Sequence, residues 1–250
     1  MKNKIVTLIC IFAIVATTAV VALANQTNPT YVNSNDNSPV PSELIRQHVY
    51  NKADVELAVE YTEPIYPKGE IYRQVKVENL SQQHDVLVKT VFVFEAGDIS
   101  DMASFKKVFD ISFSTDKNNW TLNNDVTNWT INNEWEFVQY GGKNYVMTSA
   151  TYDKPLIKHV AGSANSYTEP LFVKVEMLDT VTNEMTAQFA DRYELLITSY
   201  AVQAEGWTVN NNPVNLAETD VVGDILDQVV GVVGTNYVPE WDKLAPYNNY

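Results

Sequence analysis

The chain is nearly free of cysteine. Its single cysteine, Cys10, lies in the apolar stretch at the amino terminus, and the rest of the sequence has no thiol. Once that stretch is removed, the chain can form no disulfide, no cysteine-ligated zinc site and no cysteine nucleophile. A domain without these cross-links must hold together by burial and strand pairing, or by contacts between subunits.

Basic residues are also scarce. The chain has 17 Lys and Arg against 31 Asp and Glu, which gives a formal net charge of -14. A surface of this charge repels nucleic acids and anionic membranes, so we expect neither as a partner. Divalent cations remain compatible with it.

Recognisable catalytic motifs are missing from the sequence. His48, His84 and His159 are its three histidines, and none falls in an H-E-x-x-H spacing. G-x-S-x-G and a glycine-rich phosphate loop are also absent. We therefore predict no catalytic, cofactor-binding or metal-ligating residues, and we interpret the histidines as ordinary surface or core residues.

Acidic loop residues could bind a cation weakly. Asp98 with Asp101, and Asp116 in another loop, offer carboxylate oxygens of the kind that calcium prefers. Their spacing is not that of an EF-hand. Weak Ca²⁺ binding is therefore the most that the sequence suggests, and no cofactor is expected.

The amino terminus has the pattern of a secretory signal. Lys2 and Lys4 precede an apolar run over residues 5–21, and Ala22 and Ala24 supply the small residues of a cleavage site. We predict cleavage after this pair, contact with the membrane only during export, and a mature protein in the extracellular matrix or at the cell surface. The alternative is an uncleaved anchor, because a run of about 20 apolar residues can span a bilayer.

Composition divides the chain into four parts. We predict a signal peptide over residues 1–24, a flexible leader over residues 25–53, a sandwich over residues 54–210 and a helical tail over residues 211–250. The leader is rich in Asn, Ser and Pro and has little to bury. In the tail, apolar residues near helical spacing predict an amphipathic helix over residues 216–230.

Short strands fill the body of the sequence. Alternating or continuous apolar segments separated by turns are typical of strands. They occur at residues 54–62, 71–80, 86–94, 111–114, 120–122, 129–131, 135–140, 144–152, 156–160, 170–177 and 192–207. One short peripheral helix is expected over residues 98–108, capped by Ser100. The pattern predicts an all-β fold, an antiparallel β-sandwich of jelly-roll type.

The stretch RYELLITSYAVQAEGW, residues 192–207, is a long strand candidate. Apolar side chains occupy both of its faces, which predicts a strand in the middle of the structure. Gly206 permits a tight bend at its end, and Trp207 can then fold back as an apolar plug.

Three sequence blocks carry a family resemblance. They are AVQAEGW at residues 201–207, GGKNY at residues 141–145 and PLFVKVEM at residues 170–177. Together they resemble the TasA/camelysin family, which comprises secreted subunits of bacterial biofilm fibres. The resemblance implies a structural jelly-roll protein that polymerises with itself by donor-strand-type β-addition. It also implies an accessory fibre subunit or a dedicated signal peptidase as further partners.

The leader is the expected donor of that strand. Its alternating apolar side chains, available for docking on a neighbour, are Leu44, Ile45, Val49, Val55, Leu57 and Val59. The family's leader carries an aromatic motif directly after cleavage, where this chain has Asn25-Gln26-Thr27. The donor segment must therefore lie further along the chain.

Two other functions remain open. The resemblance also implies a cell-surface metallopeptidase of camelysin type, although the sequence shows no zinc motif. A surface adhesin that binds glycan or another protein is the third interpretation, because the chain is rich in Trp and Tyr. Against it, Trp120, Trp129 and Trp135 fall in strand candidates, where cross-strand aromatic pairing is the more frequent outcome.

Overall fold

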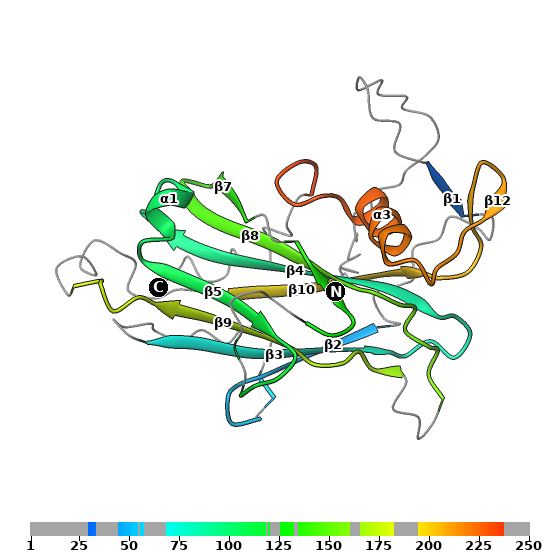
Figure 1. The fold of residues 1–250 in the computed structure, drawn as a ribbon, viewed down its shortest axis with the longest axis horizontal. Coiled ribbons are helices and arrows are strands. Elements are labelled where there is room, and N and C mark those ends of the chain that lie inside the picture. The colour runs from blue at the N-terminus through cyan, green and yellow to red at the C-terminus, as the bar shows by residue number, and fades with distance from the viewer. Residues whose placement is uncertain are drawn as a thin grey trace, which may run out of the picture.

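Two antiparallel sheets packed face to face form the body of this computed structural model (Figure 1). The structure describes residues 30–33, 45–54, 56–57, 69–118, 120, 126–132, 135–160, 166–182 and 195–237. Strands dominate these segments, and two helices accompany them. The all-β sandwich predicted from the sequence is confirmed.

The first layer is a five-stranded sheet in which β4 lies between β10 and β8. Its strands are β4 (Val86–Gly97), β6 (Trp129–Ile131), β7 (Glu136–Tyr140), β8 (Lys143–Tyr152) and β10 (Leu195–Gln203). Both β6 and β7 pair with β8, along different parts of its length. The continuous apolar run in β4 is buried on both faces, as a central strand requires.

The second layer is a four-stranded sheet of order β2-β3-β9-β5. Its strands are β2 (Ile45–Tyr50), β3 (Glu70–Asn79), β5 (Phe109–Ser114) and β9 (Leu171–Met177). Side chains alternate between its two faces. Val75 and Val173 belong to the core, while Lys76 and Lys174, one residue further along, lie on the outer face.

Aromatic rings fill the space between the sheets. Phe92 of β4 meets Phe113 of β5 edge to face, with 5.0 Å between the ring centroids. Nearer α1, Phe94 packs against Phe105 and Phe109. Burial of this surface is the main driving force for folding in a body without disulfides.

The helix α1 (Met102–Phe105) is much shorter than the predicted helix over residues 98–108. Its N-cap is Asp101, not Ser100, and the Asp101 side chain accepts a hydrogen bond from the backbone N–H of Ser104 at 2.8 Å. Phe105 is its one buried residue. After Phe105 the backbone continues in turns, in which Val108 donates its N–H to the carbonyl of Phe105 at 2.9 Å. Ile99 and Val108, at the two ends of the predicted span, are buried without being helical.

The helix α3 (Thr219–Val230) lies across the outer face of the five-stranded sheet (Figure 1). Its buried side chains Val222, Ile225 and Leu226 pack on Leu87 and Val202 of the sheet. The predicted amphipathic helix is confirmed, with a start slightly later than expected. No helix in the described part of the chain is long and apolar enough to cross a membrane.

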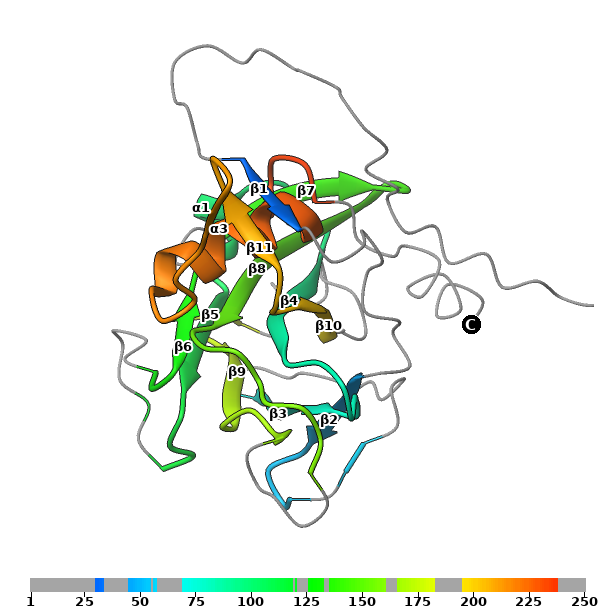
Figure 2. The ribbon, with the colours of Figure 1, turned by 90° about the vertical axis from the view of Figure 1, so that its right-hand side faces the viewer.

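A third, small sheet stands beside α3 (Figure 2). It contains β1 (Tyr31–Asn33), β11 (Trp207–Val209) and β12 (Asn212–Pro213). Gly206 has a φ of 87°, the left-handed conformation that the predicted bend requires. Trp207 is buried, and its indole N–H donates to the carbonyl of Gln203 at 2.6 Å, so the predicted plug is confirmed.

β10 is an edge strand, which corrects the prediction that residues 192–207 form a central one. Among the described strands, β4 alone pairs with it. Both faces of β10 are nevertheless covered, because Ile197 packs in the sandwich core and Val202 packs beneath α3. A helix on the second face produces the same apolar pattern as a position in the middle of a sheet.

Residues 156–160 do not form the predicted strand. Leu156 makes one isolated bridge with Val86. The backbone after it contacts the loop between β3 and β4. The N–H of Lys158 donates to the Asp85 carboxylate at 2.8 Å, and the N–H of His159 donates to the carbonyl of Ser81 at 2.6 Å. Loop contacts therefore replace a strand ladder.

The first predicted strand, over residues 54–62, does not begin where expected. Asp54 lies in a turn with a φ of 59°, which is incompatible with an extended strand. Glu56 makes an isolated bridge with Tyr50, and Leu57 donates its N–H to the carbonyl of Val49. Residues 58–62 lie outside the described residues.

Candidate functional site

The strand β1 docks in a receptor formed by β11 and α3. Tyr31 lies opposite Val209 in the antiparallel pairing. On its other side, the Tyr31 N–H donates to Gln228 Oε1 at 2.9 Å, and Gln228 Nε2 donates to the Tyr31 carbonyl at 2.8 Å. The side-chain amide of Gln228 thus satisfies both backbone groups of one residue, as a neighbouring strand would.

Tyr31 also supplies the apolar part of this contact. Its side chain is buried in the cluster that includes Trp207 and Ile225. The hydroxyl group donates to Asp224 Oδ2 at 3.2 Å, and burial together with that carboxylate raises the pKa of Tyr31. A strand of three residues is therefore fixed through its backbone, its ring and its hydroxyl.

The edges of the two sheets adjoin at β2 and β10. Gln47 of β2 donates a side-chain hydrogen bond to the carbonyl of Ile197 in β10 at 2.8 Å. No described strand continues either sheet beyond these two edges. Contacts of the same chain already use part of these edges, since Gln47 occupies the Ile197 carbonyl and Leu57 donates its N–H to the Val49 carbonyl.

The residues predicted to donate a strand lie in different places. Ile45 and Val49 are in β2, pair with β3 of their own chain and pack against the core. Leu57 follows the turn after β2. Leu44, Val55 and Val59, and the predicted cleavage residues Ala22 and Ala24, lie outside the described residues.

The predicted flexible leader thus contains two strands. Both β1 and β2 fall within residues 25–53, and both pair with the body of the same chain. β2 forms part of the main sheet, whereas β1 is a separate piece at the far end of α3 (Figure 1). Of the two, β1 is the shorter, with three residues against six.

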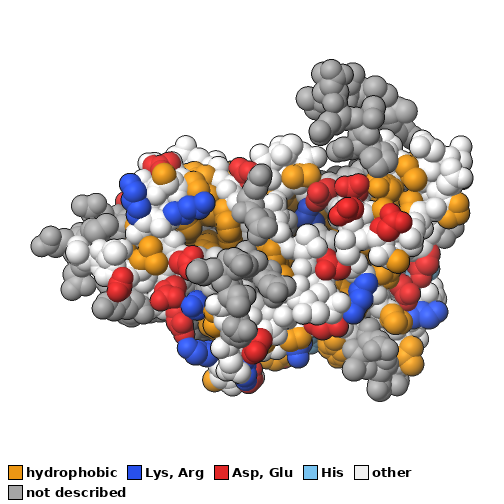
Figure 3. All heavy atoms as spheres, viewed as in Figure 1, with side chains coloured by type: hydrophobic (Ala, Val, Ile, Leu, Met, Phe, Trp, Pro, Cys, Tyr) orange, Lys and Arg blue, Asp and Glu red, His pale blue; other side chains and the backbone are white. Residues whose placement is uncertain are grey.

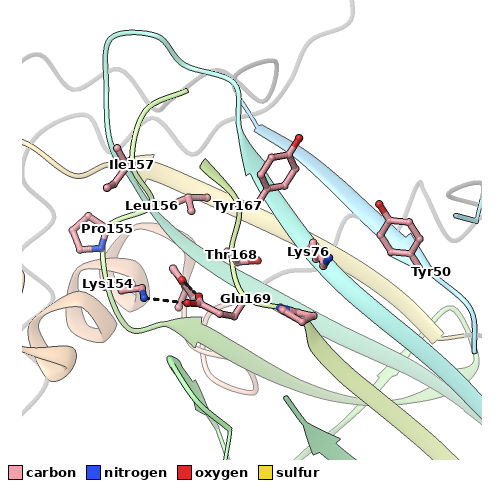
Figure 4. Close-up of a pocket in the computed structure, with 11 residues that line it drawn as sticks. Tyr50, Lys76, Lys154, Pro155, Leu156, Ile157, Tyr167, Thr168 and Glu169 are labelled. Atoms are coloured by element: carbon pink, nitrogen blue, oxygen red, sulfur yellow. Dashed lines mark hydrogen bonds and ion pairs between the residues drawn. The ribbon is translucent and has the colours of Figure 1, made fainter. Parts of the chain in front are cut away.

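A groove of about 730 Å³ opens beside the four-stranded sheet (Figure 4). Its walls include Tyr50, Lys76, Tyr152, Lys154, Tyr167 and Glu169. The ammonium group of Lys154 lies 3.2 Å from Glu169 and 5.6 Å from the centre of the Tyr152 ring. This mixture of rings and charges suits binding to a polar partner.

Tyr152 and Glu169 are coupled within this groove. The Tyr152 hydroxyl donates to Glu169 Oε2. Burial, followed by the hydrogen bond to this carboxylate, raises the pKa of Tyr152. Burial alone would raise the pKa of Glu169, but hydrogen bonds from Tyr152 and Lys154 outweigh it and lower the pKa. The pair therefore presents a neutral phenol and an ionised carboxylate at neutral pH.

A cluster of polar groups surrounds the buried carboxylate of Glu78. Tyr167 donates its hydroxyl to Oε1 at 2.8 Å, and the Nε2 of His48 lies 3.3 Å from Oε2. His159 approaches the same carboxylate at 3.9 Å. The sequence does not predict this cluster, because His48 reaches Glu78 only through the pairing of β2 with β3. His159 is held near it by the hydrogen bond from its backbone N–H to the carbonyl of Ser81.

The structure gives no metal centre in the part that it describes. No group of three or more His, Cys, Asp or Glu residues among these segments could hold a metal ion. Asp101 caps α1, and Asp116 accepts a hydrogen bond from the backbone N–H of Asn118 at 2.9 Å. Weak calcium binding at these carboxylates stays a prediction of the sequence.

Comparison with known proteins adds little to this picture. No family model matches the chain, and no curated protein matches it in sequence. One similar solved structure is described by the words "AvmM Catalyzes Macrocyclization in Alchivemycin A Biosynthesis". It is 11% identical, the match covers 76% of this chain and 100% of that chain, and the TM-score is 0.31. A likeness this low carries no argument about the present chain.

Proposed function

We propose that this protein is an exported structural subunit of an extracellular fibre, and that it assembles by exchanging β1 between copies. The sequence blocks that resemble the TasA/camelysin family motivate the fibre. The observation that carries the exchange is the docking of β1. Three residues near the amino terminus are held by β11 and α3, more than 170 residues further along the chain.

The contacts of β1 do not require that donor and receptor belong to one molecule. Backbone pairing with β11, the two hydrogen bonds to Gln228 and the pocket for the Tyr31 ring form equally well with a neighbour's segment. Exchange of an identical element between copies is a low-cost route to assembly. The expected partner is therefore a second copy of this chain, with an accessory fibre subunit as a further candidate.

Charge opposes this assembly. The chain carries a net charge of -14, and α3 adds acidic side chains beside the docking site of β1 (Figure 3). Protons or divalent cations reduce repulsion between such surfaces. We expect filaments, followed by light scattering and negative-stain microscopy, to form faster at about pH 5 than at about pH 8.

A disulfide trap tests the exchange. The chain from Asn25 onward has no cysteine, and Val32 lies directly opposite Thr208 in the β1–β11 pair. Cα atoms of opposed antiparallel residues are about 4.5 to 5.5 Å apart, which suits a disulfide. In the double variant Val32→Cys, Thr208→Cys, oxidised filaments should give a ladder of covalent oligomers on a non-reducing gel.

A second double-cysteine variant, placed in the β2–β3 pair, shows whether β1 or β2 is the exchanged strand. Tyr50 lies opposite Gln74 in the β2–β3 pair. The variant Tyr50→Cys, Gln74→Cys should yield only cross-linked monomers, because β2 stays in its own sheet. A ladder from this second pair would assign the exchange to β2. Monomers from both pairs within intact filaments would refute strand exchange altogether.

Peptidase activity stays a prediction of the family resemblance alone. A casein assay of the purified protein, with and without a chelator, decides it.

A further inference from the structure

A second, smaller pocket of about 290 Å³ lies on the outer face of the four-stranded sheet. Tyr72 of β3 and Lys174 of β9 face each other across its floor, since they are opposed in the strand pairing. Trp120 and Lys117 reach it from the segment after β5, and Lys52 reaches it from the turn after β2. Residues far apart in the sequence therefore converge on one small cavity.

Two aromatic rings form part of its wall. Trp120, which is half-buried and not in a strand, meets Tyr72 edge to face with 5.7 Å between ring centroids. Its indole N–H donates to the carbonyl of Lys117 at 3.1 Å, which fixes the position of the ring. The ammonium group of Lys174 lies 5.3 Å from the ring centre. The Trp120 ring therefore lines the pocket from a segment outside the sheet.

The hydroxyl group of Tyr72 is buried and has no hydrogen-bond partner among the described residues. The whole residue is only 6% exposed. Burial, with the charges of Asp54 and Glu70, raises the pKa of Tyr72 to about 12, so the hydroxyl keeps its proton at neutral pH. Buried polar groups are almost always paired, so this hydroxyl calls for a partner such as water or a bound ligand.

The lysines around the pocket do not make it a site for anions. Lys52 pairs with Glu70, and Lys117 lies 3.1 Å from Asp54. Lys174 lies 3.0 Å from Glu176. Each ammonium group is thus neutralised by a carboxylate, and the whole molecule is strongly acidic. The pocket offers hydrogen-bond donors and acceptors without net positive charge, which disfavours an anionic ligand.

We propose that this pocket binds a neutral hexose unit of a glycan. A sugar ring presents hydroxyl groups that both donate and accept, which matches the paired lysines, Glu70 and the free Tyr72 hydroxyl. Its C–H face matches the apolar surface of Trp120. A volume of about 290 Å³ lies at the small end of ligand pockets and fits one such unit. The proposal does not depend on fibre assembly.

The test uses monomeric protein and single sugars. Saturation-transfer NMR and tryptophan fluorescence should detect glucose, galactose or N-acetylglucosamine, with a dissociation constant on the order of 1 mM. Glucuronate and inorganic phosphate serve as anionic probes and should bind more weakly than the best neutral sugar. Tighter binding of either anion would overturn the proposal, as would the absence of binding by all three neutral sugars.

Three variants locate the site. Trp120→Ala should abolish binding. Tyr72→Phe keeps the ring and removes the buried hydroxyl, so it should weaken binding about fivefold, the effect of one hydrogen bond, without loss of fold. Tyr140→Phe, the matched control, removes an exposed hydroxyl from β7 of the other sheet, outside both pockets, and should leave binding unchanged. Unchanged affinity in Tyr72→Phe, or a loss in Tyr140→Phe, would refute the assignment to this pocket.

Discussion

The two sheets differ in what covers their outer faces. The outer face of the five-stranded sheet is sealed by α3 and by residues 230–237, which bury apolar side chains from β4, β8 and β10. The outer face of the four-stranded sheet carries alternating polar side chains such as Lys76 and Lys174, and both pockets are lined from it. Apolar burial therefore stabilises the covered outer face, while both pockets lie on the open, polar one.

The largest expected effect comes from the covered face. Ile225 of α3 is fully buried against the sheet. Ile225→Ala should lower the free energy of unfolding by about 3 to 4 kcal/mol, because it removes buried methyl groups and leaves a cavity. Val229→Ala on the same helix is the control, since Val229 is 36% exposed and should cost less than about 1 kcal/mol. Equal losses in urea denaturation would show that α3 does not seal the sheet.

The next effect concerns a buried charge beneath α3. The ammonium group of Lys89 is held by the Asp227 carboxylate and by the carbonyl of Gly231 at 2.8 Å. The Lys89 side chain is 2% exposed, whereas that of Asp227 is 44% exposed. Asp227→Ala leaves a buried cation without its counter-ion and should cost about 3 kcal/mol, the low end for a broken buried pair.

The converse change should be much milder. Lys89→Met preserves the packing, and water can solvate the half-exposed Asp227. We expect a change within about 1 kcal/mol, because a hydrophobic replacement of a buried charge is often neutral. Thermal and urea unfolding of the two variants measure this asymmetry. Similar losses in both would mean that the ion pair, and not the isolated cation, determines the cost.

Most strands of the main sheets were predictable because local patterns determine them. β4 has a continuous apolar run, and β9 alternates Val173 and Val175 with Lys174 and Glu176. Such patterns report how many faces are buried but not what buries them. For that reason β10 was predicted to be central, although α3 covers its second face.

The candidate sites were not predictable, because they depend on strand register. Tyr72 and Lys174 are separated by about 100 residues and meet only because β3 pairs with β9. The same holds for His48 and Glu78, which the β2–β3 pair brings together. A period-2 pattern fixes the face of each side chain but leaves its cross-strand partner open.

A smaller effect is expected from acid titration on the open face. Burial alone would raise the pKa of Glu78, but hydrogen bonds from Tyr167 and His48 outweigh it and lower the pKa. A lowered pKa in the folded state means that this carboxylate stabilises the fold above its unfolded pKa of about 4.3. That stabilisation is lost as the pH falls through the folded value.

Glu78→Gln should therefore flatten the pH dependence in acid. At neutral pH the variant should lose about 1 kcal/mol, the value of one hydrogen bond. As the pH falls below about 4.3, the difference in stability between the variant and the unchanged protein should shrink. The Glu78 carboxyl group is then protonated and uncharged, like the Gln amide that replaces it. Urea unfolding between about pH 2 and pH 7 measures this. A constant difference across the range would show that Glu78 does not titrate with folding.

The smallest effect is expected from an exposed ion pair at the rim of the smaller pocket. Asp54 and Lys117 are 57% and 48% exposed, so Asp54→Asn should change the free energy of unfolding by less than about 0.5 kcal/mol. Asp54 also has a φ of 59°, which Asn tolerates and Ala does not. Asp54→Ala should then cost about 1 kcal/mol, all of it from the backbone. Equal losses in the two variants would mean that the lost charge, and not the backbone conformation, accounts for the change. Polar side chains on the open face would then also support the fold.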